Sequence, residues 1–228
     1  MNIEKNLDRI LKEIPQNVTL VAVTKHRSIE EIQRVVDYGI KDLGENRVQE
    51  LLDKYDKIKG DIRWHLIGHL QTNKVKYIAP FVSLIHSVDS LKVLAEINKH
   101  ALKNDRIIDC LLQIYIADED TKFGLDHAEA IELLRSEEFG GFKNIRIRGL
   151  MGIASNTENE KIVKEEFYEL KMLFDGIKTT YFRKEESFDI LSMGMSSDYK
   201  VAIEQGSNMV RLGSTIFGKR IIKHYKAQ

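Results

Sequence analysis

The sequence predicts an α/β protein built as a single (β/α)₈ barrel (TIM barrel), preceded by one extra N-terminal helix. The chain has 228 residues, a length that one such barrel fills. Short apolar segments alternate with segments of helical period, and eight such units can be counted. No stretch rich in proline, glycine or serine divides them, so one domain over residues 1–228 is expected. An open doubly wound sheet, which needs fewer strands, remains the alternative.

Apolar spacing predicts each element in turn. The extra helix has five apolar residues on one face and ends before Pro15; these are Ile3, Leu7, Ile10, Leu11 and Ile14. Apolar runs then predict strands at 18–23, 40–46, 61–69, 82–90, 106–117, 144–154, 187–195 and 206–214. Helices are expected between them at 28–39, 47–58, 90–104, 127–135, 163–177 and 199–204.

Composition excludes several classes of function. The 35 basic and 35 acidic residues cancel, which gives no reason to expect nucleic acid or an anionic membrane as a partner. No apolar run reaches the length of a membrane-spanning helix, and charges interrupt the N-terminal segment, so no signal peptide is expected. The single cysteine, Cys110, lies in an apolar run and is expected to be a buried thiol in a reducing compartment. A cytoplasmic protein is therefore expected.

The loops after the seventh and eighth strands are the strongest candidates for a ligand site. In barrels this position commonly holds a phosphate, and the strand ends carry the chemistry. The segments "MGMSSD" and "RLGS" supply glycines for close backbone approach and hydroxyls for hydrogen bonds: Gly194, Ser196, Ser197, Gly213 and Ser214. Either loop alone could be an ordinary strand-to-helix turn, where glycine and serine are good capping residues. Their joint occurrence at these two strand ends favours a phosphate site.

Lys25 ends the first strand, in "TLVAVTKH", and would face that phosphate site across the mouth of the barrel. A lysine and a phosphate site in one barrel indicate an aldehyde-bearing phosphate cofactor held as a Schiff base. The amine must be neutral to react, which desolvation by the apolar flank of the strand or the cation of Arg211 would favour. Taken alone, a lysine at a strand end is usually a solvated charge or an ion-pair partner.

Other candidate sites are weaker. His65 and His69 lie four residues apart, but on a strand and a loop rather than on a helix. We expect His65 to pack beside Trp64 and His69 to lie in a turn, so no metal site is predicted. No serine lies in a G-x-S-x-G nucleophile elbow, so no Ser/His/Asp triad is proposed.

Several motifs occur in a family order. They are "VAVTKH", "GENRVQE", "WHLIGHLQTNKVK", "IHSVDS", "GLMGI" and "LSMGMSSDYKVAIEQGSNMVRLGSTIFGKR". Together they cover residues 21–220 and closely resemble the YggS/PROSC family, the pyridoxal 5′-phosphate (PLP) homeostasis proteins. The long last motif and the overall order carry most of the specificity.

The resemblance implies an alanine-racemase-like barrel (PLP fold type III) with PLP held as a Schiff base on Lys25. The other cofactor contacts that it implies are Asn46, His86, Met195, Ser196, Arg211, Gly213 and Ser214. Arg211 would lie near either the pyridine nitrogen or the phosphate. The segment "DTKFG" is similar to the family's S-K-x-G loop, with Thr121 in place of the serine.

Three functions remain open. The resemblance favours a carrier that holds PLP in vitamin B6 homeostasis without classical catalysis, with apo PLP-dependent enzymes as partners and a monomer as the expected state. A racemase would need a second acid/base group opposite Lys25. In full-length racemases this group comes from a C-terminal domain and a partner subunit, and here the sequence ends soon after the eighth strand. The third possibility is a barrel that binds some other phosphorylated metabolite.

Overall fold

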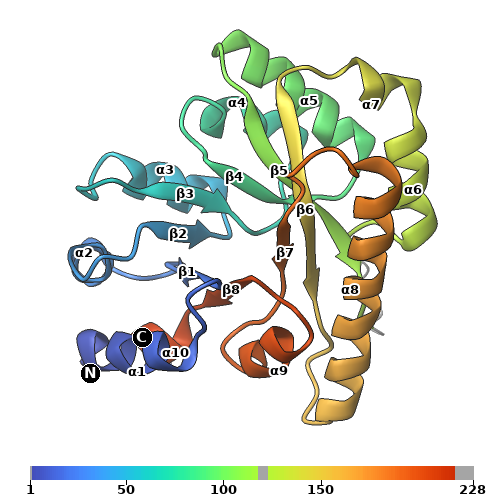
Figure 1. Cartoon of the computed structure of the whole chain (residues 1–228). Coiled ribbons are helices and arrows are strands. Elements are labelled where there is room, and N and C mark those ends of the chain that lie inside the picture. Colours follow the sequence, from blue (N-terminus) through green and yellow to red (C-terminus); the bar gives the residue numbers. More distant parts are fainter. Residues whose placement is uncertain (1, 118–122, 219–228) are drawn as a thin grey trace, which may run out of the picture.

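Eight parallel strands close into a barrel in the order of the sequence, and β8 pairs back with β1. The structure is a computed structural model that describes residues 2–117 and 123–218 (Figure 1). The strands are β1 (Thr19–Val23), β2 (Asp42–Glu45), β3 (Arg63–Leu66), β4 (Leu84–Val88), β5 (Ile108–Tyr115), β6 (Ile145–Ile153), β7 (Ile190–Ser192) and β8 (Met209–Leu212). The predicted (β/α)₈ barrel is confirmed, and the open sheet is excluded.

Helices surround the strands (Figure 1). They are α1 (Ile3–Glu13), α2 (Ile29–Asp37), α3 (Val48–Tyr55), α4 (Val75–Ile78), α5 (Leu91–Lys103), α6 (His127–Arg135), α7 (Glu137–Gly141), α8 (Glu160–Tyr181), α9 (Tyr199–Glu204) and α10 (Ser214–Phe217), with a 3₁₀ turn η1 (Thr72–Lys74). Ser28 caps α2 in a capping box with Glu31, which explains where that helix begins. None of the described helices is long and apolar enough to cross a membrane.

The extra helix α1 forms where the apolar spacing predicts it and packs against α2 and α10. Ile10 and its predicted partners are buried, but Leu11 is 44% exposed. Leu11 lies at the edge of the predicted apolar stripe, where solvent reaches its side chain.

The core has two parts. The larger part lies between the strands and the helices, and a smaller cluster fills the barrel interior: Val21, Leu84, Leu111, Met151 and Met209. Strand register places Ser192 beside Met209 and His65 beside Leu84. Because paired residues of parallel strands point to the same face, these polar side chains also face the interior. The barrel interior thus holds polar side chains beside an apolar cluster.

Candidate functional site

A cavity of about 570 Å³ opens at the carboxyl ends of the strands. All but one of the cofactor contacts that the resemblance implies line it: Lys25, Asn46, Met195, Ser196, Arg211, Gly213 and Ser214. The exception, His86, is fully buried in β4. Ser197 of the predicted phosphate loop also lines it, and Gly194 does not. Thr121 of the predicted "DTKFG" loop lies outside the described residues. The first and last strands of the barrel therefore contribute to one site.

Lys25 reaches this cavity from the end of β1. Several hydrogen bonds hold the residue before it, Thr24. Its hydroxyl donates to Glu45 Oε1 at 2.7 Å, and Lys54 Nζ donates to its carbonyl oxygen at 2.8 Å. The residue after it, His26, has a φ of 58°, which turns the chain sharply out of the strand. Lys25 is held on a rigid base, as a reactive group requires.

The side chain of Lys25 is exposed, so the apolar flank of the strand does not bury it. The strand's apolar residues face the barrel and the helices, and the lysine lies beyond them at the rim. Within residues 2–117 and 123–218, no hydrogen bond or ion pair engages its amine. The amine is therefore available to a ligand in the cavity.

The two late loops are joined through Ser196. Its hydroxyl oxygen accepts hydrogen bonds from the backbone N–H groups of Gly213, at 3.2 Å, and Thr215, at 3.3 Å. The first loop is itself tightened by Asp198, whose carboxylate accepts from the N–H of Met195 at 2.6 Å. The hydroxyl proton of Ser196 is left to be donated to an anion. The two loops are therefore strand-to-helix turns that also form a polar cradle for an anion.

Arg211 is a buried cation in the wall of the cavity. It donates to the carbonyl oxygen and hydroxyl of Ser192, at 2.8 and 2.7 Å, and to the carbonyl oxygen of Gly152 at 2.9 Å. Burial lowers the pKa of Arg211 to about 10, so the guanidinium keeps its charge at neutral pH. Three of its five N–H donors are bound to protein, which leaves two for a ligand.

Asn46 and His86 occupy different depths. Asn46 lines the cavity, and its side-chain oxygen is a buried acceptor without a hydrogen-bond partner in the described structure. His86 lies below, with Nε2 at 2.9 Å from His65 Nδ1 and Nδ1 at 3.2 Å from Ser192 Oγ. The unsatisfied oxygen of Asn46 is the kind of atom that a bound ligand satisfies.

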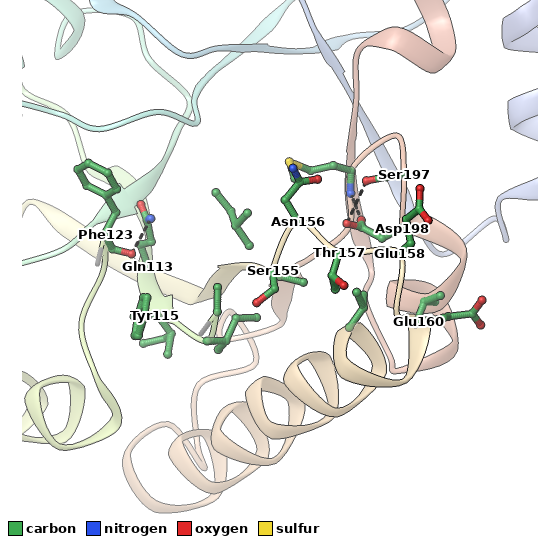
Figure 2. A pocket seen from close by; sticks show the side chains of 18 residues that line it. Gln113, Tyr115, Phe123, Ser155, Asn156, Thr157, Glu158, Glu160, Ser197 and Asp198 are labelled. Atoms are coloured by element: carbon green, nitrogen blue, oxygen red, sulfur yellow. Dashed lines mark hydrogen bonds between the residues drawn. The ribbon is translucent and has the colours of Figure 1, made fainter. Parts of the chain in front are cut away.

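A second cavity of about 630 Å³ adjoins the first and shares Ile153, Met195 and Ser197 with it. Figure 2 shows Gln113 and Phe123 on one side of this second cavity, and Thr157 and Asp198 on the other. The loop after β6 supplies much of its polar wall, including Asn156 and Glu158. This loop is not among the site residues predicted from the sequence. Its position after a strand end was the signal that could have marked it.

His65 has polar partners rather than the packing role expected for it. Its Nε2 lies 3.0 Å from Asp42 Oδ1, and Arg63 also donates to that carboxylate. His69 lies after β3 and contacts Asp89 at 3.0 Å. Among the described residues, no cluster of three or more histidine, cysteine or carboxylate side chains could hold a metal ion.

Comparison with known proteins agrees with this architecture. Residues 1–220 match the family model described as "Alanine racemase, N-terminal domain". The chain is 38% identical to the pyridoxal phosphate homeostasis protein of Aquifex aeolicus, covering 96% of this chain and 99% of that protein. It is 36% identical to the protein of the same name from Escherichia coli K12, over 90% of this chain and 87% of that one.

Solved structures show the same barrel. PipY of Synechococcus elongatus PCC7942, in a structure with PLP bound, superposes with a TM-score of 0.86 at 29% identity, covering 95% of this chain and 100% of that one. Alanine racemase of Clostridium difficile 630 superposes with a TM-score of 0.76 at 16% identity, and only 57% of that chain is covered. This second likeness concerns the fold alone. The chain belongs to the alanine racemase N-terminal domain family and, within it, to the pyridoxal phosphate homeostasis proteins.

Proposed function

We propose that this protein binds PLP as a Schiff base on Lys25 and acts as a carrier in intracellular PLP homeostasis. The observation that carries the proposal is the meeting at one cavity of a polar cradle, a buried arginine and an amine that no described residue engages. The names of the relatives and the PLP in the PipY structure support the choice of cofactor. When bound, PLP supplies an aldehyde that condenses with a primary amine and releases one water molecule.

The residues of the cavity fit this cofactor. The Ser196 and Ser214 hydroxyls and nearby backbone N–H groups would bind the phosphate. Arg211 would offer its two remaining donors to the ring nitrogen or to the phosphate. The free oxygen of Asn46 would accept a hydrogen bond from the cofactor. Each polar group of the cavity wall would then have a partner.

The proposal favours a carrier over a racemase because of the chemistry of the cavity wall. Racemisation requires a second group that can exchange a proton on the face opposite the lysine. Among the described residues, the wall of this cavity contains no histidine, tyrosine, cysteine or carboxylate side chain. Among these described wall residues, no second acid/base side chain would accompany Lys25.

Reduction with borohydride tests the attachment. Protein incubated with PLP should absorb in the range of about 400–430 nm, and reduction should fix the cofactor on Lys25, located by peptide mass spectrometry. The variant Lys25→Ala should lose the absorbance, whereas Lys5→Ala in α1 should retain it. Labelling of a different lysine would contradict the attachment, and a wild type that fails to bind PLP would favour another phosphorylated ligand.

Transfer to an apo-enzyme tests the carrier role. The PLP-loaded protein should activate an apo PLP-dependent enzyme. The control reaction contains the same apo-enzyme with free PLP at the same concentration. Inversion of single amino-acid enantiomers at enzyme-like rates would instead identify a racemase. The carrier is proposed to be a cytoplasmic monomer, for which sedimentation at the mass of one chain is the expected result.

A further inference from the structure

A continuous chain of polar side chains runs through the barrel interior beneath the cavity. It connects Arg211, Ser192, His86, His65 and Asp42, all of which are buried. The successive distances are 2.7 Å from the guanidinium to the serine hydroxyl, 3.2 Å to His86, 2.9 Å to His65 and 3.0 Å to the carboxylate. Arg63 donates to the far carboxylate at 2.7 Å. Residues from β8, β7, β4, β3 and β2 thus share one network.

The two ends of this chain fix the direction of its hydrogen bonds. Arg211 can only donate, and the ionised Asp42 can only accept. With both histidines neutral, each group between them therefore accepts one hydrogen bond and donates the next. His86 then carries its proton on Nε2 and accepts from the Ser192 hydroxyl at Nδ1, and His65 likewise donates from Nε2. This arrangement satisfies every member of the chain.

The electrostatics of the site agree with this arrangement. Burial, with the cation of Arg211 nearby, lowers the pKa of His86 well below its ordinary value, which keeps the ring neutral. Burial acts against ionisation of Asp42, but hydrogen bonds from His65 and Arg63 lower its pKa to about 2. The carboxylate is therefore a permanent acceptor at neutral pH.

We propose that His86 is a positioning residue that acts through Ser192 on Arg211 and holds its guanidinium in place at the cofactor site. His65 and Asp42 hold His86 in the tautomer that this role needs. Since the Ser192 hydroxyl gives its proton to His86, its oxygen lone pairs face the guanidinium. The inference rests on the proposed PLP function, because Arg211 is assigned there to the cofactor.

A mutant cycle tests whether Ser192 acts through Arg211. Ser192→Ala removes one guanidinium contact, so PLP affinity should fall about three- to tenfold, the effect of one lost hydrogen bond. In an Arg211→Met background the same change should have no further effect, because the group that it positions is gone. Ser207→Ala is the matched control, since Ser207 is also buried and its hydroxyl lies within hydrogen-bond distance of three carbonyl oxygens of the barrel. Equal losses for both serines, or an equal effect of Ser192→Ala in both backgrounds, would overturn the proposal.

A second pair of variants separates positioning from packing and decides the case if Ser192→Ala does not fold. His86→Asn keeps an acceptor near the position of Nδ1. His86→Leu introduces a side chain of almost the same shape as asparagine, but without an acceptor. Asparagine should retain most of the PLP affinity and the absorption maximum of the bound cofactor. Leucine should lose affinity to the same extent as Ser192→Ala. Similar behaviour of the two variants would contradict a role through Ser192.

The hydrogen-bond direction can be tested without the cofactor. Nitrogen-15 NMR of the histidine rings at neutral pH should show His86 and His65 neutral, both with the proton on Nε2. A proton on Nδ1 of His86 would overturn the inference whatever the protein binds. Conversely, the protein could show the expected tautomers and fail to bind PLP. That result would contradict the proposed function and support the hydrogen-bond network.

Discussion

Gly149 lies where β6 and β7 approach each other too closely for a side chain. A Cβ atom at this position would come within 1.8 Å of the carbonyl oxygen of Ile190, and the φ of Gly149 is +149°. The register between β5 and β6 also shifts beside it, between Cys110 and Leu111. We expect Gly149→Ala to lower the free energy of unfolding by about 3 kcal/mol or more, because the backbone of one strand must move. Urea denaturation measures this loss.

Gly176 provides the opposite case and the control. It lies within α8, and no atom lies within 4 Å of the place where its Cβ would be. Gly176→Ala should therefore stabilise the protein by about 0.5–1 kcal/mol through helix propensity. A similar loss at both glycines would show that close approach is not the cause at Gly149.

The cavity residues could be predicted because their signal is local. Lys25 and Ser214 each follow a strand, and the barrel rule brings strand ends together. The depth of His86 could not be predicted in this way. Its contacts with His65 and Ser192 depend on the register of β3, β4 and β7, which a single sequence does not encode locally. The exposure of Lys25 was missed for a similar reason, because the height of the rim depends on the neighbouring loops.

At the scale of elements, α3 supports the end of β1 through one buried cation. Lys54 donates to the carbonyl oxygen of Thr24 and forms an ion pair with Glu45 in β2. Burial raises the pKa of Glu45, although Lys54 and Thr24 donate hydrogen bonds to it. Lys54→Met would leave this carboxylate without a cation, so we expect a loss of about 3 kcal/mol in the free energy of unfolding. PLP retention should fall as well, since Thr24 precedes Lys25.

The exposed pair of Lys41 and Asp61 serves as the control for that prediction. Its atoms lie 2.7 Å apart, but both side chains are more than half exposed. Lys41→Met should change the stability by less than about 1 kcal/mol, because solvent screens the pair. Denaturation curves at neutral pH compare the two variants. Equal shifts of the two curves would contradict a special role for the buried pair.

The strands were predictable as elements, but the shortest helices were not. Each predicted strand segment contains an observed strand, although 187–195 contains only the three residues of β7. The apolar run continues beyond β7 because Met193 packs in the core outside the strand. The helices α4, α7 and α10 have at most five residues each, which is too short for a 3.6-residue period to be recognised.

For the molecule as a whole, the polar network within the barrel predicts how stability depends on pH. The folded protein keeps His86 neutral, and the unfolded chain takes up a proton at this residue below a pH of about 6.5. Stability should therefore fall by up to about 1.4 kcal/mol per pH unit below that value. The carboxylate of Asp42 acts in a lower range. Its folded pKa of about 2 stabilises the protein above about pH 4, and this contribution is lost as the pH falls towards 2.

Denaturation at a series of pH values separates the two contributions. His86→Asn should remove much of the slope between about pH 6.5 and 5, since no imidazole remains to be protonated in the unfolded chain. Asp42→Asn should instead flatten the curve between about pH 4 and 2. His127→Asn, at an exposed position in α6, should leave both ranges unchanged. Because the barrel unfolds together with its interior, these slopes report the cost of burying the network. A wild type with constant stability from pH 6.5 to 5 would mean that His86 is protonated in the folded barrel, and the direction of hydrogen bonds to Ser192 would then be reversed.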